Sequence, residues 1–341
     1  MFGRVTCASG LEIPLLRFDA PCKDDGSCLS SGGEVRERHE YARNPAFGAD
    51  PQDPHGVWLQ RFALYGDWQR PDGWRVFAER HSALESGRAA GPGPTDQNRL
   101  EIQNAFLDAP LPIAPGVEAR VRIGRQEMQF GSARLISVRD GPNVRRTFDG
   151  ARLLIRSGRW AVDAIAVRPR DDEPGAFDDS TDDARALWGV YATRRLGAGN
   201  ERGVDVYYLG YRNDDAVFDQ SKGSERRHML GVKYFGSHGP WDWKAEPMVQ
   251  CGRFGRVELR PWTIATETGY TWSDLRWRPR VMLSANIASG DRNPEDAGLG
   301  TFNPLYDARN NHTAAHELGA PTRITGPGNR REYSRPPPPG P

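Results

Sequence analysis

The chain has 341 residues, and 46 Lys and Arg side chains against 45 Asp and Glu leave no global charge to attract nucleic acid. Apolar residues make up only 37%, which is low for a soluble domain, yet ten Trp, ten Tyr and thirteen Phe exclude a disordered chain. No apolar run approaches the ~18 residues of a membrane helix, so a helical membrane protein is excluded. A transmembrane β-barrel is still allowed, because only every second residue of its strands must be apolar.

Residues 1–32 are expected to form a poorly ordered leader. They contain no basic region followed by a long apolar run, so the sequence as written carries no secretory signal. Either the protein is cytoplasmic or its true start is missing, and the body of the chain favours the second explanation. Cys22 and Cys28 could close a small disulfide loop, but incidental thiols are the simpler interpretation, and their spacing matches no zinc site.

From about residue 33 to residue 289, apolar and polar residues alternate in short stretches that end at Gly, Pro and Asp. Val121 and Ile123, for example, alternate with Arg120 and Arg122. A period of two predicts β-strands, and the pattern indicates roughly a dozen antiparallel strands joined by hairpins.

The breaks between the predicted strands are alternately short and long. Long polar segments fall at 131–146, 169–184 and 213–226, and Trp and Tyr gather near strand ends. Tight turns on one side, long loops on the other and aromatic girdles are typical of an outer-membrane barrel. A soluble sandwich or propeller is the alternative. It is disfavoured because the chain has too few apolar residues to fill a core and carries large charged groups on strand after strand.

Charge is segregated along the chain. Residues 99–170 hold thirteen Arg and seven acids, whereas residues 171–183 hold seven acids and no base. The acidic run is expected to be a solvated loop rather than a metal site. If the aliphatic faces meet lipid, several charged strand residues point into the lumen, namely Arg120, Arg122, Arg152, Arg156 and Arg280 with Glu101, Asp242, Glu246 and Glu267. Arginine-lined pores favour anions, and the guanidinium fork suits carboxylates, although Arg–acid ladders could equally serve to stabilise a polar interior.

The most specific signal lies in residues 124–150, which read GRQEMQFGSARLISVRDGPNVRRTFDG. This segment resembles the alginate export family of bacterial outer-membrane channels. Further blocks agree in the correct order, namely RLEIQNAFLD (99–108), ALWGVYATRRL (186–196), ERRHMLGVKYFG (225–236), CGRFG (251–255) and SGDRNPEDAGLGTFNPLY (289–306).

The resemblance implies an all-β, antiparallel transmembrane β-barrel in the outer membrane that passes an alginate-like anionic polysaccharide by passive diffusion. It implies no enzyme activity, cofactor or metal; the partners are the polysaccharide, outer-membrane lipid and, left open, a periplasmic export machinery. Carried over by position, Arg125 and Arg152 are constriction residues. The wider predicted solute-contact set comprises Arg122, Glu127, Arg145, Arg146, Asp149 and Arg156.

The sequence departs from the family pattern at both ends, since it lacks the signal peptide and the strands that follow the FNPL block. We therefore expect the barrel, residues 33–306, to be incomplete and to miss its C-terminal closing strands, with residues 307–341 as a disordered, Pro-rich tail. Two functional alternatives are a general anion-preferring porin and a polysaccharide-degrading enzyme on a β scaffold. His228 and Glu246 are candidates for the latter, but no nucleophile motif supports it. A soluble carbohydrate-binding module is the third alternative.

Overall fold

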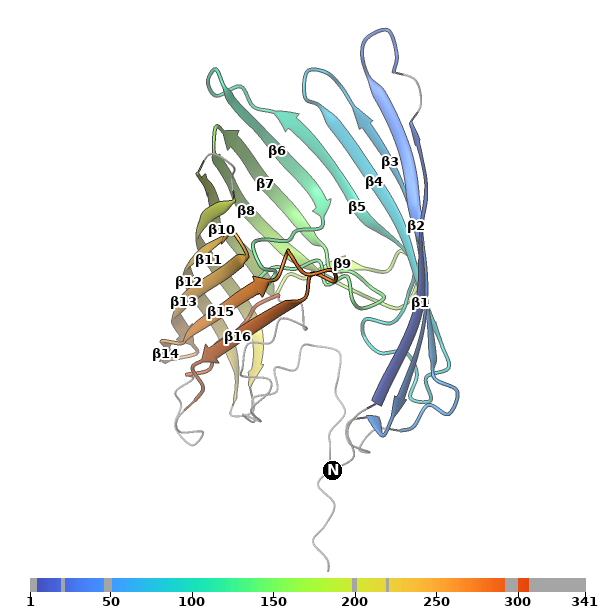
Figure 1. Ribbon diagram of the computed structural model, residues 1–341. Helices are drawn as coiled ribbons and strands as arrows, with labels where there is room; N and C mark the ends of the chain where they lie inside the picture. The colour runs from blue at the N-terminus through green and yellow to red at the C-terminus, as the bar shows by residue number, and fades with distance from the viewer. Residues whose placement is uncertain are drawn as a thin grey trace, which may run out of the picture.

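The computed structural model describes residues 5–19, 22–45, 51–197, 201–218, 221–291 and 300–306. These residues form one antiparallel sheet of sixteen strands (Figure 1). The strands in chain order are β1 (Val5–Asp19), β2 (Cys28–Arg43), β3 (Val57–Gln69), β4 (Arg75–Ser86), β5 (Asn98–Pro110), β6 (Val117–Gln126), β7 (Phe148–Ser157), β8 (Trp160–Asp171), β9 (Ser180–Thr181), β10 (Arg185–Leu196), β11 (Arg202–Phe218), β12 (Ser221–His238), β13 (Trp241–Phe254), β14 (Val257–Leu259), β15 (Trp262–Thr271) and β16 (Arg280–Ala288). Within these ranges, no helix has the length and apolarity needed to span a bilayer.

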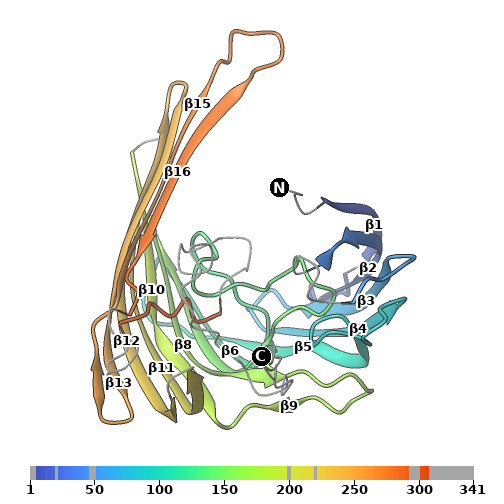
Figure 2. The same ribbon diagram turned by 90° about the horizontal axis from the view of Figure 1, so that it is seen from below.

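The strands follow one another as an up-and-down meander. Each long strand pairs with its neighbours in sequence, while the short strands β9 and β14 lie off this path, on β8 and β13. Antiparallel pairing follows from the hairpin connections that the sequence predicted. Among the described residues, β1 and β16 do not pair with each other, and Figure 2 shows the sheet curved into an open trough between these two edges. The expected incomplete all-β barrel is thus confirmed.

The two ends of the sheet differ in their connections. Segments 87–97, 127–147 and 172–179 lie at one end, which we call the long-loop end. Segments 70–74 and 158–159 close hairpins at the opposite end, which we call the short-turn end.

The two faces of the sheet also differ. On β3, Phe62 and Leu64 are 39% and 60% exposed, whereas Leu59 and Arg61 on the other face are buried. We call the buried face, which the curve of the sheet encloses, the concave face, and the opposite one the convex face (Figure 2). Exposed aliphatic side chains continue across the convex face on Val76, Ile123, Val190, Val206, Leu230, Val232, Val249 and Ile264. The period of two therefore separates an exposed aliphatic face from a largely buried one.

One predicted stripe is interrupted. The sequence pattern put Ile102 and Phe106 on one face of β5, but Ile102 is exposed and Phe106 is buried. The reason is a β-bulge, since the register of β4 against β5 shifts at Gln103, and both Gln103 and Asn104 are buried. An extra residue in one strand reverses the phase of every side chain beyond it.

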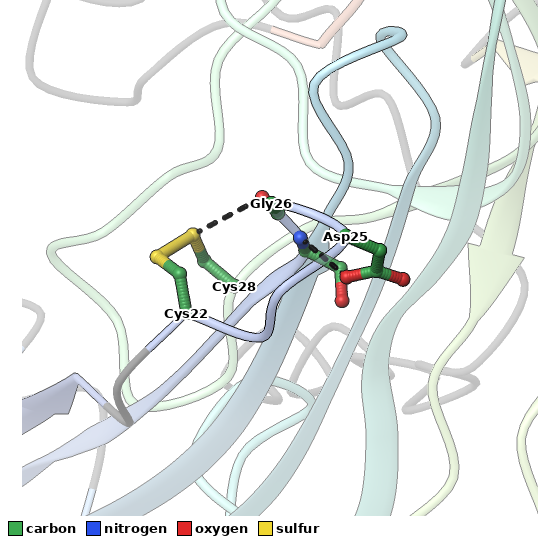
Figure 3. The surroundings of a disulfide bond; sticks show 5 residues. Cys22, Asp25, Gly26 and Cys28 are labelled. Atoms are coloured by element: carbon green, nitrogen blue, oxygen red, sulfur yellow. Dashed lines mark hydrogen bonds between the residues drawn. A yellow bond between two sulfur atoms is a disulfide. The ribbon is translucent and has the colours of Figure 1, made fainter.

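The sheet begins earlier than the predicted boundary at residue 33. Strand β1 pairs with β2 from Val5 to Asp19, so the segment expected as a leader contributes to the sheet. Cys22 and Cys28 form a disulfide in the connection between these strands (Figure 3), so the interpretation of the two residues as incidental thiols is wrong. The tail predicted over residues 307–341 lies outside the described residues.

Candidate functional site on the concave face

The connection between β6 and β7, residues 127–147, folds into the trough, and we call it the inner loop (Figures 1 and 2). Arg36 and Arg61 donate to the carbonyl oxygen of Asp140 at 2.8 and 3.2 Å. The Asn143 side-chain amide donates to three main-chain carbonyls of β3, β4 and the β4–β5 connection at 2.9 to 3.1 Å. These bonds replace the water that an exposed loop would use, so the inner loop is fixed against the early strands.

The opposite side of the trough holds the inner loop as well. Arg134 forms ion pairs with Glu246 at 3.5 Å and with Glu267 at 2.9 Å, on β13 and β15. The Ser137 amide donates to the carbonyl of Tyr306 at 3.0 Å. An apolar cluster between the inner loop, β7 to β13 and the segment 300–306 comprises Met128, Leu135, Ile136, Phe148, Ile165, Val167, Leu187, Tyr191, Tyr207, Leu209, Tyr211, Met229, Met248, Phe302 and Tyr306. The trough is therefore partly filled by packed side chains.

A cavity of about 530 Å³ lies between the inner loop and the short-turn end of β7, β8 and β10. We call it the arginine cavity, because its lining includes Arg152, Arg156, Arg159 and Arg195, together with Asp163, Phe130, Trp160 and Tyr191. Alternation brings together the side chains of Arg152, Arg156, Asp163, Tyr191 and Arg195, since positions of equal phase on neighbouring antiparallel strands share a face.

The charges of this cavity are unbalanced. Arg152 and Arg156 share one buried carboxylate, that of Asp163, at 2.7 and 3.2 Å. Within the described ranges, no carboxylate lies at ion-pair distance from Arg159 or Arg195. Four guanidinium groups thus face one aspartate, and a carboxylate ligand would supply the missing negative charge.

Aromatic rings form one wall of the arginine cavity. Phe130 stacks on Tyr191 with centroids 5.1 Å apart, and Tyr191 stacks on Tyr207 at 5.0 Å. The Tyr191 hydroxyl donates to Asp205 at 2.7 Å, which fixes the plane of the ring. Flat apolar surfaces next to guanidinium groups suit a ligand that has both an apolar ring face and a carboxylate.

Of the residues predicted to contact solute, Arg152 and Arg156 line the arginine cavity, whereas Glu127 and Arg145 pair with each other. The Arg145 guanidinium lies 2.9 Å from the Glu127 carboxylate and also pairs with Glu79 on β4. Because residues 127 and 145 stand at the two ends of the inner loop, this pair closes the loop at its base.

The other predicted residues are also held by partners. Arg122 forms two bonds to the buried Asp108 at 2.6 and 2.8 Å, and Arg125 forms two to Asp149 at 2.8 and 3.1 Å. Alternation puts Arg125 on the face of Ile123, away from the arginine cavity. Arg146 lies over the ring of Tyr306, 5.2 Å from its centroid. The contact of these residues with solute stays a prediction.

Sequence reasoning missed Arg159 and Arg195 as site residues, because both lie beside turns. The amide of Arg195 donates to the carbonyl of Arg159 at 3.0 Å, so these two turn-flanking residues are adjacent in the fold. The signal that could have found Arg195 is its phase, since it is four residues beyond Tyr191 and shares its face.

The acidic segment after β8 packs on the start of β5. Oxygens of Glu101, Asp178 and Asp179 lie within 4.8 Å of one another. Arg170 reaches Asp179 at 3.1 Å and Arg125 reaches Glu101 at 3.6 Å, so this acidic group already has cationic partners. Burial raises the pKa of Asp179 to about 6 although Arg170 opposes the rise.

A curved antiparallel meander with an exposed aliphatic face and a charged opposite face is the architecture of an outer-membrane β-barrel protein. The model of the alginate export family matches residues 27–321, and the chain belongs to this family. A search of curated proteins finds no match. Membership supports polysaccharide export across the outer membrane as the general function, in a family of transport proteins rather than enzymes.

Proposed function

We propose that the protein is an outer-membrane channel through which an anionic, alginate-like polysaccharide or oligosaccharide diffuses passively along the arginine-lined concave face. The observation that carries the proposal is the arginine cavity, in which four guanidinium groups face the single carboxylate of Asp163. A uronate supplies a carboxylate for Arg159 and Arg195 and an apolar ring face for the aromatic wall formed with Phe130 and Tyr191.

Weak binding of the solute suits its passage through the channel. An exposed Arg–carboxylate contact in a hydrated channel is worth about 0–1 kcal/mol, so a uronate can leave one site for the next. Asp163 holds Arg152 and Arg156, which limits the number of guanidinium groups that are available to the solute at once.

The remaining predicted residues act on the shape of the passage in this proposal. Glu127 and Arg145 close the base of the inner loop. Arg125 and Asp149 tie together the ends of β6 and β7 from which the loop departs. Arg122 ties β6 to β5 through Asp108, and Arg146 lies against the ring of Tyr306, so both hold segments next to the inner loop in place.

Two further features support the outer membrane as the location. The exposed aliphatic convex face matches a lipid environment, where apolar residues are needed only on the outside of a barrel. The disulfide between Cys22 and Cys28 is compatible with an oxidising compartment such as the periplasm. A periplasmic export machinery would deliver the polymer to the channel.

Recording of ionic current across a planar bilayer tests the proposal. We expect an anion-selective current that uronate oligomers block transiently. The variant Arg159→Ala/Arg195→Ala should weaken this block about tenfold, as loss of two charge-assisted contacts predicts. Arg256→Ala, which removes an exposed arginine outside the arginine cavity, is the matched control and should keep the block.

Three outcomes would contradict the proposal. A chloride-selective current without any oligomer block indicates a general porin. Release of unsaturated or reducing sugar ends from alginate, without conductance, indicates an enzyme. A protein that fractionates without detergent indicates a soluble carbohydrate-binding module.

A further inference from the structure

A second cavity, of about 500 Å³, lies on β12, β13 and β14 at the long-loop end. Its lining includes Arg226, His228, Cys251, Arg253, Glu258 and Arg260. The function proposed above does not use this cavity, and we call it the outer basic pocket.

The outer basic pocket opens on the convex face. Arg226 and His228 have the phase of Leu230, which is 57% exposed, and Arg253 has the phase of Val249, which is 54% exposed. Side chains of equal phase share a face, so the arginines and these aliphatic residues form one surface. With a rise of about 3.3 Å per residue, Arg226 stands roughly 13 Å along the strand from Leu230.

Arginines are directly opposite one another in this region. Arg226 pairs in register with Arg212 on β11 and with Arg253 on β13. Like charges at opposed positions of an antiparallel sheet are destabilising. A row of arginines such as Arg212, Arg226 and Arg253 is stabilised when anions lie between the guanidinium groups.

Among the residues that the structure describes, carboxylates pair with arginines only at the margins of this region. Arg212 has Asp214 at 3.3 Å, and Arg260 has Glu258 at 3.2 Å. For Arg226 and Arg253, the described ranges offer no carboxylate within ion-pair distance. Glu258 lies opposite Arg253 in register but pairs with Arg260, so in the described part of the chain the centre of the outer basic pocket holds two guanidinium groups that form no ion pair.

We propose that the outer basic pocket binds the phosphate of a glycolipid headgroup in the outer leaflet of the outer membrane. Arg226 and Arg253 bind the phosphate oxygens, since the guanidinium fork matches phosphate geometry. The acyl chains run along the aliphatic side chains of Leu230, Val249 and Ile264 on the same face. The long-loop end corresponds to the outer leaflet, because outer-membrane barrels have their long loops outside. This inference rests on the proposed membrane location.

Binding of diphosphoryl lipid A to the detergent-solubilised protein, followed by native mass spectrometry, tests the inference. We expect a bound lipid on the wild type and an affinity at least tenfold lower in Arg226→Gln/Arg253→Gln, which keeps polar side chains at both positions and removes both charges. Arg256→Gln is the matched control and should bind within twofold of the wild type. Lipid A without its phosphates should bind as weakly to the wild type as lipid A binds to the double variant.

Two results would overturn the inference. One is equal lipid A affinity in the wild type and in a double variant that still shows the heat-modifiable band of a folded barrel. The other is displacement of lipid A by an equal concentration of inorganic phosphate, which indicates a site for free anions. The double variant should keep its block by uronate oligomers, so loss of lipid binding and loss of transport are distinguishable.

Discussion

The backbone amide of Arg195 donates to the backbone carbonyl of Arg159 at 3.0 Å, so one main-chain bond holds two cavity arginines that no carboxylate of the described ranges neutralises. Arg195 is the penultimate residue of β10, at the short-turn end, and Arg159 lies in the turn between β7 and β8. Their adjacency creates the positive charge on which the proposed transport depends.

Replacement of Arg195 distinguishes direct contact with the solute from long-range electrostatic attraction. Arg195→Lys keeps the positive charge but loses the planar fork, so we expect the affinity for uronate oligomers to fall about threefold. Arg195→Gln removes the charge as well, and a fall of about fivefold is expected, in keeping with the modest worth of one exposed Arg–carboxylate contact. Block of current by oligomers measures both. Equal affinities in the lysine variant and the wild type would indicate that the positive charge alone attracts the solute.

Asp163 competes with the solute for guanidinium groups. Asp163→Asn releases Arg152 and Arg156 from their shared carboxylate, so we expect dwell times of blocking oligomers to lengthen severalfold. Single-channel recording measures these dwell times. Asp242→Asn, which loses the ion pair with Arg280 outside the arginine cavity, is the control. Shorter dwell times in the Asp163 variant contradict the proposed competition.

Arg145 anchors the inner loop. Its removal leaves Glu79 and Glu127 without their cationic partner in a largely buried place, and loss of one partner of a buried ion pair costs about 3–5 kcal/mol. Arg145→Ala should therefore lower the urea concentration at which the folded band disappears on gels. Arg120→Ala is the control, because Arg120 is half-exposed and 3.9 Å from Asp108, where about 0–1 kcal/mol is expected. Equal midpoints for the two variants would contradict an anchoring role.

Local pattern predicted the strands well and long-range contacts poorly. Alternation in β6 gave the exposed Ile123 and its opposite neighbour Arg122, because the phase of a strand is a local property. The pair of Arg134 with Glu246 joins residues more than a hundred positions apart. No local pattern records that pair, because it depends on the folding of the inner loop into the trough.

The β-bulge in β5 and the disulfide between β1 and β2 were not predicted for a similar reason. Gln103 looks like an ordinary member of an alternating stretch, and only its register against β4 reveals the extra residue. The disulfide between Cys22 and Cys28 depends on the approach of β1 to β2, which the weak alternation of the first residues did not predict.

Gly124 has a close backbone neighbour that forbids a side chain. Its φ is +127°, and a Cβ there would stand 2.2 Å from the carbonyl oxygen of Ala105. Gly124→Ala should destabilise the folded state by about 1–3 kcal/mol, since strain of this kind has that cost. A Cβ at Gly66 meets open space, so Gly66→Ala should change the stability of the folded state by less than about 1 kcal/mol. Urea midpoints of the folded band compare the two, and similar midpoints contradict the prediction.

Asp179 gives the folded state a defined pH dependence. Burial raises its pKa from 3.8 to about 6, so between these values the folded state holds a proton that the unfolded state has released. Stability from this group is therefore present below about pH 4 and is lost as the pH rises toward 6. The urea midpoint of the wild type relative to Asp179→Asn should fall over this interval and level off above it.

Asp178→Asn is the matched control for this pH series, because Asp178 is the exposed neighbour in the same acidic group. Its urea midpoint gives the effect of removing one exposed carboxylate from this group. A constant difference between the wild type and the Asp179 variant over the same range would mean that Asp179 ionises equally in both states. In that case the bond from Asn98 at 2.8 Å and the ion pair with Arg170 would outweigh burial, and the carboxylate would stay charged in the folded protein.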